Sequence, residues 1–214
     1  LVDDQAAFIE AATTAGFPQT DDHNHPASSG VGPLPLNNPD GVRWSTAIGY
    51  LTMARDRPNF TISPDSHTTR ILLNGKRAVG VEYQKGGSSI QVHAEEVVLS
   101  AGPIGSPHLL MLSGIGPAEQ LQNAGITVVN DMPGIGQNLR DHPSVHVRWS
   151  ADENFPMPDV KMGPQKVALR YTARGSPFRN DMIAVMRWDS PKREFMMSAG
   201  LSLAKASGEL RLNS

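Results

Sequence analysis

The sequence predicts a mixed α/β fold, and three stretches of the chain carry that prediction. An apolar run over 97–99 has the composition of a buried strand, and a glycine turn and a capped helix follow it directly. Between 60 and 93, runs rich in β-formers alternate with turns such as Asn74-Gly75, a pattern typical of an antiparallel meander. After Pro143 the chain changes to strands with one polar face, which indicates part of a second, antiparallel sheet.

The stretch from 96 to 116 predicts the first candidate site. Its strand ends in Ala101-Gly102, which leaves the backbone almost bare, and open α/β sheets bind ligands at the carboxyl ends of their strands. We therefore expect Ala101 and Gly102 to contact a ligand through their main chain. The helix after them has its own start and stop signals, namely Ser106 at the N-cap, Pro107 at the first helical position and Gly114 past the end.

The amino-terminal part predicts two helices joined by a long loop. Residues 4–15 have apolar residues at helical spacing, and a second helix over 45–54 begins at the potential N-cap Ser45. Residues 20–40 lack sustained periodicity and predict a loop, which at this length is usually functional or mobile. The stripe expected to be buried in the second helix consists of Ala47, Ile48 and Leu51.

Two histidines in the long loop, His23 and His25, lie beside Asp21 and Asp22 and raise the question of a metal site. Metal ligation needs imidazoles and carboxylates aimed at one point, and no helical or turn spacing provides that here. We expect both histidines to be solvated loop residues, and we expect no metal ligand in the chain.

The composition of the chain changes near Asp141, and we place a domain boundary there, between domains 1–141 and 142–214. Further elements are expected as a short helix over 117–124 and strands over 126–129, 145–149, 182–188 and 195–203.

Composition argues against several classes of function. The chain has 19 basic and 21 acidic residues, a net charge of -2 and no basic cluster, so it lacks the electrostatic footprint of a nucleic-acid-binding protein. It has no cysteine, which rules out disulfides and is compatible with a reducing cytoplasm, where we expect the protein to reside. No apolar run approaches the roughly 20 residues that span a bilayer, and the start does not resemble a secretory signal.

Four motifs give the chain a specific resemblance to the glucose-methanol-choline (GMC) family of flavoenzymes. The longest, GPIGSPHLLMLSGIG over 102–116, resembles the second signature of that family. The others are GVRWSTA over 41–47 followed by Tyr50-Leu51, RAVGVE over 77–82, and PGIGQNLRDHP over 133–143.

The resemblance implies that 1–141 is part of a Rossmann-like FAD-binding domain with a β-meander. It also implies that 142–214 is part of an antiparallel-sheet, substrate-binding domain. In the family, the strand end that matches Ala101 and Gly102 lies against the dinucleotide half of FAD. Thr68 matches the place where the family's backbone pairs with the adenine edge; valine is usual there, and a β-branched threonine preserves a main-chain contact.

Two parts that the family needs are missing from this sequence. It has no G-x-G-x-x-G turn for the FAD pyrophosphate, since Gly30-Val31-Gly32 continues into Pro33. The family's catalytic histidine and its His or Asn partner come near the carboxyl end, whereas the run over 207–212 resembles a family strand far upstream of them. We therefore expect no catalytic residue here, in a chain that resembles the middle of such an enzyme.

A second candidate site comes from the adjacent pair Asp141 and His142, a carboxylate beside a histidine. Neighbouring side chains on a strand point to opposite faces, so the two need not touch. We expect Asn138 and Asp141 to hold the glycine-rich turn over 133–136 instead.

For the intact protein, the resemblance implies FAD-dependent oxidation of the CH–OH group of a small alcohol, as in choline dehydrogenase-like enzymes. A histidine base would take the hydroxyl proton while hydride passes to the flavin. The chain alone is expected to be inactive, with the remaining segments of the same enzyme as its partners. Two alternatives stay open: a hydroxynitrile lyase on the same scaffold, and a non-catalytic binding module that lacks FAD.

Overall fold

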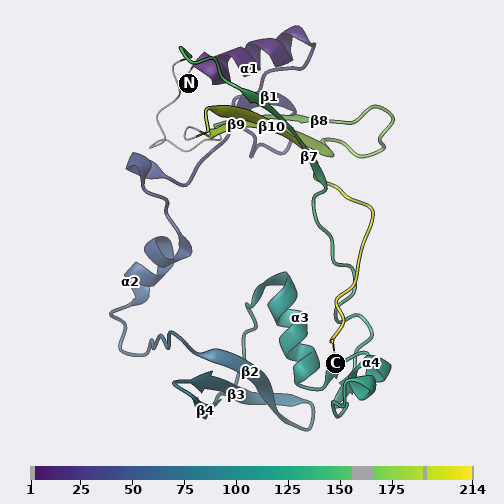
Figure 1. Cartoon of the computed structure of the whole chain (residues 1–214). Helices are drawn as coiled ribbons and strands as arrows, with labels where there is room; N and C mark the ends of the chain where they lie inside the picture. The colour runs from purple at the N-terminus through teal and green to yellow at the C-terminus, as the bar shows by residue number, and fades with distance from the viewer. Residues whose placement is uncertain (1–2, 156–165, 190–191, 214) are drawn as a thin grey trace. The chain divides into compact units, whose positions relative to one another are not determined.

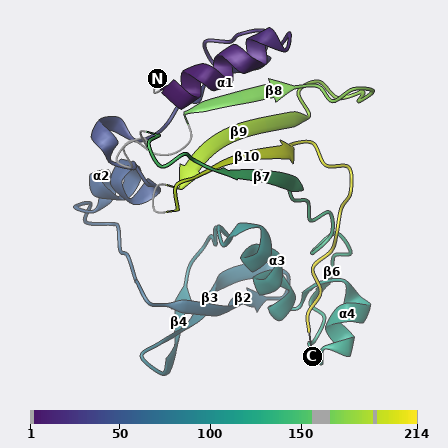
Figure 2. The ribbon, with the colours of Figure 1, turned by 45° about the horizontal axis from the view of Figure 1, so that its top comes forward.

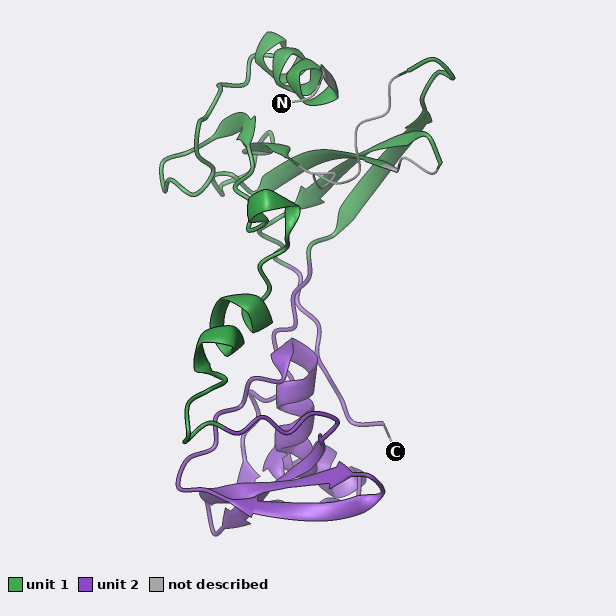
Figure 3. Ribbon diagram, turned by 90° about the vertical axis from the view of Figure 1, so that its left-hand side faces the viewer, with its two compact units in different colours: residues 1–60, 142–205 green, residues 61–141, 206–214 purple. Residues whose placement is uncertain are grey.

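The computed structural model describes residues 3–155, 166–189 and 192–213, and Figure 1 and Figure 2 show the chain in two orientations. The chain forms two compact units, coloured separately in Figure 3. Unit 1 contains residues 1–60 and 142–205, and unit 2 contains 61–141 and 206–214. One division therefore falls between Asp141 and His142, while residues 1–60 cluster with 142–205 because their strand and helix pack on the sheet formed there.

Unit 1 is built on a five-stranded antiparallel sheet in the order β1-β8-β9-β10-β7, with helix α1 packed against it (Figure 2). The strands are β1 (Gly30–Pro33), β7 (Ser144–Ser150), β8 (Val167–Tyr171), β9 (Met182–Asp189) and β10 (Glu194–Leu201). The helical segments are α1 (Asp3–Thr14), η1 (Pro39–Gly41), η2 (Ala47–Leu51) and α2 (Thr52–Ala54).

The core of unit 1 lies between α1 and the sheet. Phe8 and Ala12 of α1 are buried against Val31, Leu169 and Ala184 on three different strands. The helix expected over 4–15 is confirmed, and its apolar spacing is what brings Phe8 and Ala12 to one face.

The long loop expected over 20–40 is partly wrong, because it contains strand β1, which pairs antiparallel with β8. Two glycines allow β1 also to lie against the preceding segment over 18–20, with which it forms a parallel bridge. A Cβ on Gly30 would lie 1.8 Å from the carbonyl oxygen of Pro18, and one on Gly32 would lie 1.8 Å from that of Thr20. Only glycine permits the chain to pass this closely over its own preceding segment.

His23 is not the solvated loop residue that the sequence predicts. Its side chain is buried, and Nε2 lies 3.1 Å from the Gly32 carbonyl oxygen and 3.0 Å from that of Ala168. His25 is exposed, as expected. The two histidines differ because the pairing of β1 with β8 places two carbonyl oxygens beside the His23 ring, and these oxygens need a hydrogen-bond donor.

The second expected helix forms as a π-helical turn, η2, followed by the short α2. Ser45 Oγ accepts a hydrogen bond from the Ile48 N–H at 3.4 Å, in keeping with the expected cap. The expected burial of its stripe is wrong, since Ile48 and Ala47 are exposed and Leu51 is only partly buried.

Unit 2 combines a three-stranded antiparallel meander with two helices and a short parallel strand pair. The meander is confirmed over 67–93, although residues 60–62 form no strand. Its first turn consists of Gly75 and Lys76, one residue later than expected, because Asn74 ends the first strand and pairs with Arg77. The strand expected over 126–129 forms instead just after these residues, as β6. The elements are β2 (His67–Asn74), β3 (Arg77–Lys85), β4 (Ser88–His93), α3 (Gly102–Leu112), β5 (Ile115–Gly116), α4 (Ala118–Asn123) and β6 (Asn130–Asp131).

The buried strand expected over 97–99 does not form within the described part of the chain. The segment pairs with no strand, and Val98 is 79% exposed. A parallel strand needs neighbours that satisfy its N–H and C=O groups, and no described strand lies in register with this one. Helix α3 also begins at Gly102 rather than after Ser106.

In the described ranges, no helix is both long and apolar enough to cross a membrane.

Candidate cofactor-binding site

The turn at Ala101-Gly102 opens helix α3 in unit 2, and both residues are exposed. Gly102 has a φ of +79°, in the left-handed region that side-chain-bearing residues avoid. Apart from its chain neighbours and the backbone of α3, a Cβ at Gly102 would meet no described atom within 4 Å. The glycine is therefore required by the backbone conformation, and the space beside it is open to a ligand.

Ser106 holds this turn in shape. Its Oγ accepts a hydrogen bond from the Ala101 N–H at 3.1 Å, so the side chain reaches back over the first turn of α3. A Cβ at Gly105 would lie 3.1 Å from the Cβ of Ala101, which explains why both positions carry small residues. The sequence predicted Ser106 as a helix cap, and the structure instead gives it the role of closing the loop that precedes the helix.

Thr68 lies near the start of β2, the edge strand of the meander, and is partly buried. Its register partner on β3 is Tyr83, and the register shifts immediately after it, between Thr68 and Arg70. A shift of this kind is a bulge, which twists the strand and re-aims its main-chain groups. The main chain at Thr68 therefore pairs with β3 on one side and with no described strand on the other.

The two predicted segments are connected through the far end of α3. Ser113 Oγ accepts a hydrogen bond from the Ile71 N–H of β2 at 2.8 Å and donates one to the Leu109 carbonyl at 2.7 Å. Among the described residues, no hydrogen bond joins Thr68 directly to Ala101 or Gly102. The site is therefore positioned by the packing of α3 on β2, and Ser113 is a residue that sequence reasoning missed.

A hollow of about 510 Å³ lies between the first half of α3 and the glycine-rich loop over 134–140. Pro103, Ser106 and Leu110 form its helix side, and Leu210 also lines it. The hollow adjoins the Ala101-Gly102 turn through Pro103, so unit 2 offers concave space next to the open backbone.

The loop that contains Asn138 is held by the last segment of the chain. Leu139 and Gly208 exchange backbone hydrogen bonds at 3.0 and 2.8 Å, and the Leu210 N–H donates to the Gly136 carbonyl at 2.7 Å. Asn138 itself has a φ of +61°, as a residue in a tight turn would. Asp141 and His142 are both exposed and follow this loop.

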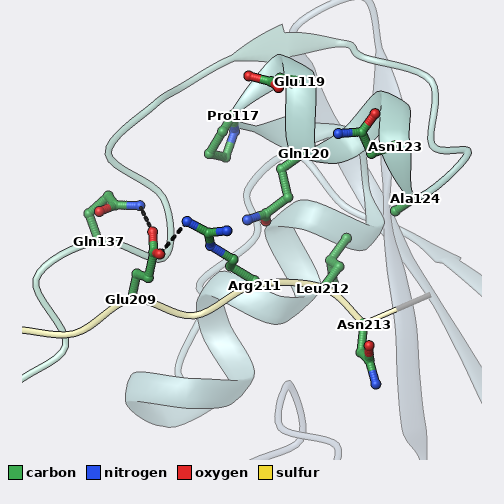
Figure 4. Close-up of a pocket in the computed structure, with 10 residues that line it drawn as sticks. All are labelled: Pro117, Glu119, Gln120, Asn123, Ala124, Gln137, Glu209, Arg211, Leu212 and Asn213. Atoms are coloured by element: carbon green, nitrogen blue, oxygen red, sulfur yellow. Dashed lines mark hydrogen bonds and ion pairs between the residues drawn. The ribbon is translucent and has the colours of Figure 1, made fainter.

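A second hollow, of about 560 Å³, lies beside α4 and the segment over 209–213 (Figure 4). Figure 4 shows Gln137 and Arg211 both directed at the carboxylate of Glu209, at 3.1 and 2.5 Å. The hydrogen bond from Gln137 and the guanidinium of Arg211 hold the pKa of Glu209 below its ordinary value. Some of the polar side chains that line this hollow therefore already form a hydrogen bond or an ion pair with one another.

Within the described ranges, no group of three or more His, Asp or Glu side chains could hold a metal ion.

Comparison with known proteins identifies the class. A family model described as GMC oxidoreductase matches residues 3–144, and the chain therefore belongs to the GMC oxidoreductase family. The resemblance inferred from the four motifs is confirmed. The enzymes of this family are FAD-dependent.

Among its relatives is the oxygen-dependent choline dehydrogenase of Photobacterium profundum. That protein is 45% identical over 158 residues, which are 73% of this chain and 28% of the relative. The mitochondrial choline dehydrogenase of Homo sapiens is 42% identical over 164 residues, again 28% of the relative. The chain thus spans less than a third of the length of these relatives.

Solved structures agree on the fold. Pyridoxine 4-oxidase from Mesorbium loti superposes with a TM-score of 0.87 at 29% identity, over 99% of this chain and 44% of the oxidase. A formate oxidase from Aspergillus oryzae, studied for its FAD modification, gives a TM-score of 0.86 at 21% identity and shows likeness of fold alone.

Proposed function

We propose that this chain is part of an FAD-dependent oxidoreductase that oxidises a CH–OH group, and that it resembles choline dehydrogenases in its reaction. In this proposal unit 2 belongs to the FAD-binding domain, since Thr68, Ala101 and Gly102 all lie in it. The sheet of unit 1 belongs to the substrate-binding domain.

The observation that carries the proposal is the open backbone at Ala101-Gly102. The adenosine half of a dinucleotide needs bare main chain that it can approach closely, and Gly102 provides it at the start of α3, where a Cβ would meet no described atom within 4 Å apart from its chain neighbours and the helix backbone. The residues present fit the adenosine half of FAD. They do not include a glycine-rich phosphate turn, which must come from elsewhere in the protein.

The role of this chain is binding rather than proton transfer. Ser106 fixes the turn and Ser113 fixes β2 against α3, so the main chain at Thr68 and Gly102 is held before a cofactor arrives. When bound, FAD supplies a hydride acceptor for the carbinol carbon. We expect the base that takes the hydroxyl proton to lie outside this stretch and the 214-residue chain alone to be inactive.

The test uses the full polypeptide in which this sequence occurs. We expect the purified protein to show flavin absorption, and an alcohol substrate added without oxygen to bleach it. Turnover of a cyanohydrin with no bleaching would replace the proposal with a lyase, and a colourless protein would replace it with a binding module.

A pair of glycine variants tests the site itself. Gly102 and Gly125 both have positive φ and both face open space, so alanine costs each about 1–2 kcal/mol of backbone strain. We expect Gly102→Ala to weaken FAD retention about tenfold or more, and Gly125→Ala to leave it unchanged, because the added methyl blocks the cofactor only at Gly102. Equal FAD retention in the two variants would contradict the assignment.

A further inference from the structure

The sheet of unit 1 has two faces of opposite character. Side chains alternate along a strand, so Met197 and Ala199 of β10 point to the face that carries the apolar core, where α1 packs. Ser198 points to the other face and lies directly across from His146 on β7. Arg187 of β9 lies on the same face as Ser198, opposite the residue two positions before Ser198 on β10. Three neighbouring strands thus place polar side chains together.

These three side chains converge on one hydroxyl group. His146 Nδ1 lies 2.8 Å from Ser198 Oγ, and an Arg187 Nη atom donates to the same oxygen at 3.3 Å. Ser198 is buried, Arg187 is partly buried, and His146 is exposed. We call this group the His146–Ser198–Arg187 cluster. Its buried part is fixed within the sheet, and its outer part is accessible from solvent.

The cluster has more hydrogen-bond donors than acceptors. Arg187 can only donate, so Ser198 Oγ accepts its hydrogen bond, and the cluster then offers acceptors only at that oxygen and one imidazole nitrogen. This holds for either tautomer of His146. The Arg187 Nε–H is buried and has no partner in the structure, and a buried donor without an acceptor is costly. The cluster therefore lacks enough hydrogen-bond acceptors for its donors.

One acidic side chain on the same face is already engaged, and Asp189 of β9 holds a further position on this face, opposite Glu194. Glu194 of β10 lies 3.5 Å from Arg148 of β7, so its carboxylate is shared with a second arginine. The side chains that the structure describes around the cluster are thus two guanidinium groups, an imidazole and the Glu194 carboxylate. The unpartnered Nε–H and the other donors of the cluster match an anion with several acceptor oxygens.

We propose that the His146–Ser198–Arg187 cluster binds an oxyanion, a carboxylate or a phosphate, carried by a small molecule. This inference rests on the proposed function, in which the sheet of unit 1 belongs to the substrate-binding domain. It assigns to the enzyme an alcohol substrate that also bears an acidic group. The relatives reported above are named for choline, whose quaternary ammonium group carries a positive charge and has no acceptor to offer Arg187.

The test is a binding measurement that needs neither flavin nor turnover, so its result is separate from that of the proposed function. The 214-residue protein is titrated with inorganic phosphate, with propionate and with tetramethylammonium, and the imidazole resonances of His146 are followed by NMR. We expect phosphate, propionate or both to move them saturably, and tetramethylammonium to leave them in place. Saturation by one of the two anions decides between the two oxyanion classes.

Variants separate the cluster from general surface charge. Arg187→Met removes the fork of donors and should weaken anion binding about tenfold or more, whereas Arg187→Lys keeps the charge and should weaken it less. Arg148→Met is the matched control, because it removes an arginine from the same face without touching the cluster. If Arg187→Met does not fold, as judged by its amide spectrum, Arg187→Lys alone carries the comparison with Arg148→Met.

Three outcomes would overturn the proposal. These are no saturable shift with either anion, a saturable shift with tetramethylammonium, and equal weakening by the Arg187 and Arg148 variants.

Discussion

Ser113 joins the last turn of α3 to strand β2 through Ile71, whose N–H donates to the Ser113 hydroxyl oxygen at 2.8 Å. The hydroxyl donates its own hydrogen bond to the Leu109 carbonyl oxygen, so one side chain satisfies a strand donor and a helix acceptor at once. Both Ser113 and Ile71 are buried. This contact sets the position of the helix whose other end carries the proposed cofactor turn.

Replacing Ser113 with alanine should therefore destabilise unit 2. The Ile71 N–H would be left buried without an acceptor, which costs about 1–3 kcal/mol. Urea unfolding of the 214-residue protein measures the loss. Ser88→Ala, at an exposed position on β4, is the control and should stay within about 0.5 kcal/mol of the parent. Equal stability of the two variants would show that β2 does not depend on Ser113.

His23 offers a second comparison, because His25 lies two residues away in the same segment. His23 is buried beside the Gly32 and Ala168 carbonyl oxygens, whereas His25 is exposed. We expect His23→Ala to lower the free energy of unfolding by about 1–3 kcal/mol, because a buried hydrogen bond is lost and a cavity opens. His25→Ala should change it by less than about 0.5 kcal/mol. A difference of the opposite sign would contradict the pairing that the structure assigns to His23.

The contrast between these histidines shows how far the sequence could predict this fold. Elements with local signals were predictable, such as helix α1 and the hairpin at Asn74-Gly75, because their apolar spacing and turn residues lie within a few positions of one another. Strand β1 was not, since a segment reading GVGP becomes a strand only when Val167–Tyr171 pairs with it. The burial of His23 depends on that same long-range pairing.

The candidate site likewise contains some residues that the sequence could predict and others that it could not. The composition of 97–99 predicts a strand, yet no strand in the described ranges pairs with it. The turn at Gly102 was predictable because a glycine between an apolar run and a helical pattern indicates an unusual backbone, here a φ of +79°. Ser113 was not, since its role depends on a strand 42 residues earlier. The His146–Ser198–Arg187 cluster likewise needs the register of three strands.

The contact between the last segment of the chain and the loop at Gln137 should weaken at low pH, because it is made through the carboxylate of Glu209. Its pKa is held below the ordinary value by the Gln137 hydrogen bond and by Arg211, so the charged form is favoured in the folded protein. The stabilisation is complete above the ordinary glutamate pKa, about 4.3, and is lost as the pH falls through the lower folded-state value.

NMR titration of the Glu209 carboxyl group should give a midpoint below the ordinary glutamate pKa of about 4.3. In Gln137→Ala and Arg211→Ala variants the Glu209 midpoint should rise toward the ordinary value, because each substitution removes one of its causes. A Glu209 midpoint unmoved in both variants would refute this account of the contact.

Gly136 should control how firmly the last segment is held. A Cβ at Gly136 would lie 2.5 Å from the Leu210 carbonyl oxygen, and the φ of Gly136 is +82°. Gly136→Ala must push Leu210 away and break the bond from its N–H to the Gly136 carbonyl. We expect the Leu210 amide to exchange with solvent about tenfold faster or more, which corresponds to roughly 1.4 kcal/mol of lost local stability.

The control for Gly136 is its neighbour Gly134, where a Cβ would meet no described atom within 4 Å. Gly134→Ala should leave the exchange of the Leu210 amide unchanged, because nothing has to move to accommodate the methyl group. The Gly208 amide, which donates to the Leu139 carbonyl at 2.8 Å, should follow Leu210 in the Gly136 variant, since both bonds fasten the same segment to the same loop. Faster exchange at Leu210 with unchanged exchange at Gly208 would mean that the two bonds open independently, and that the segment is not held as one piece.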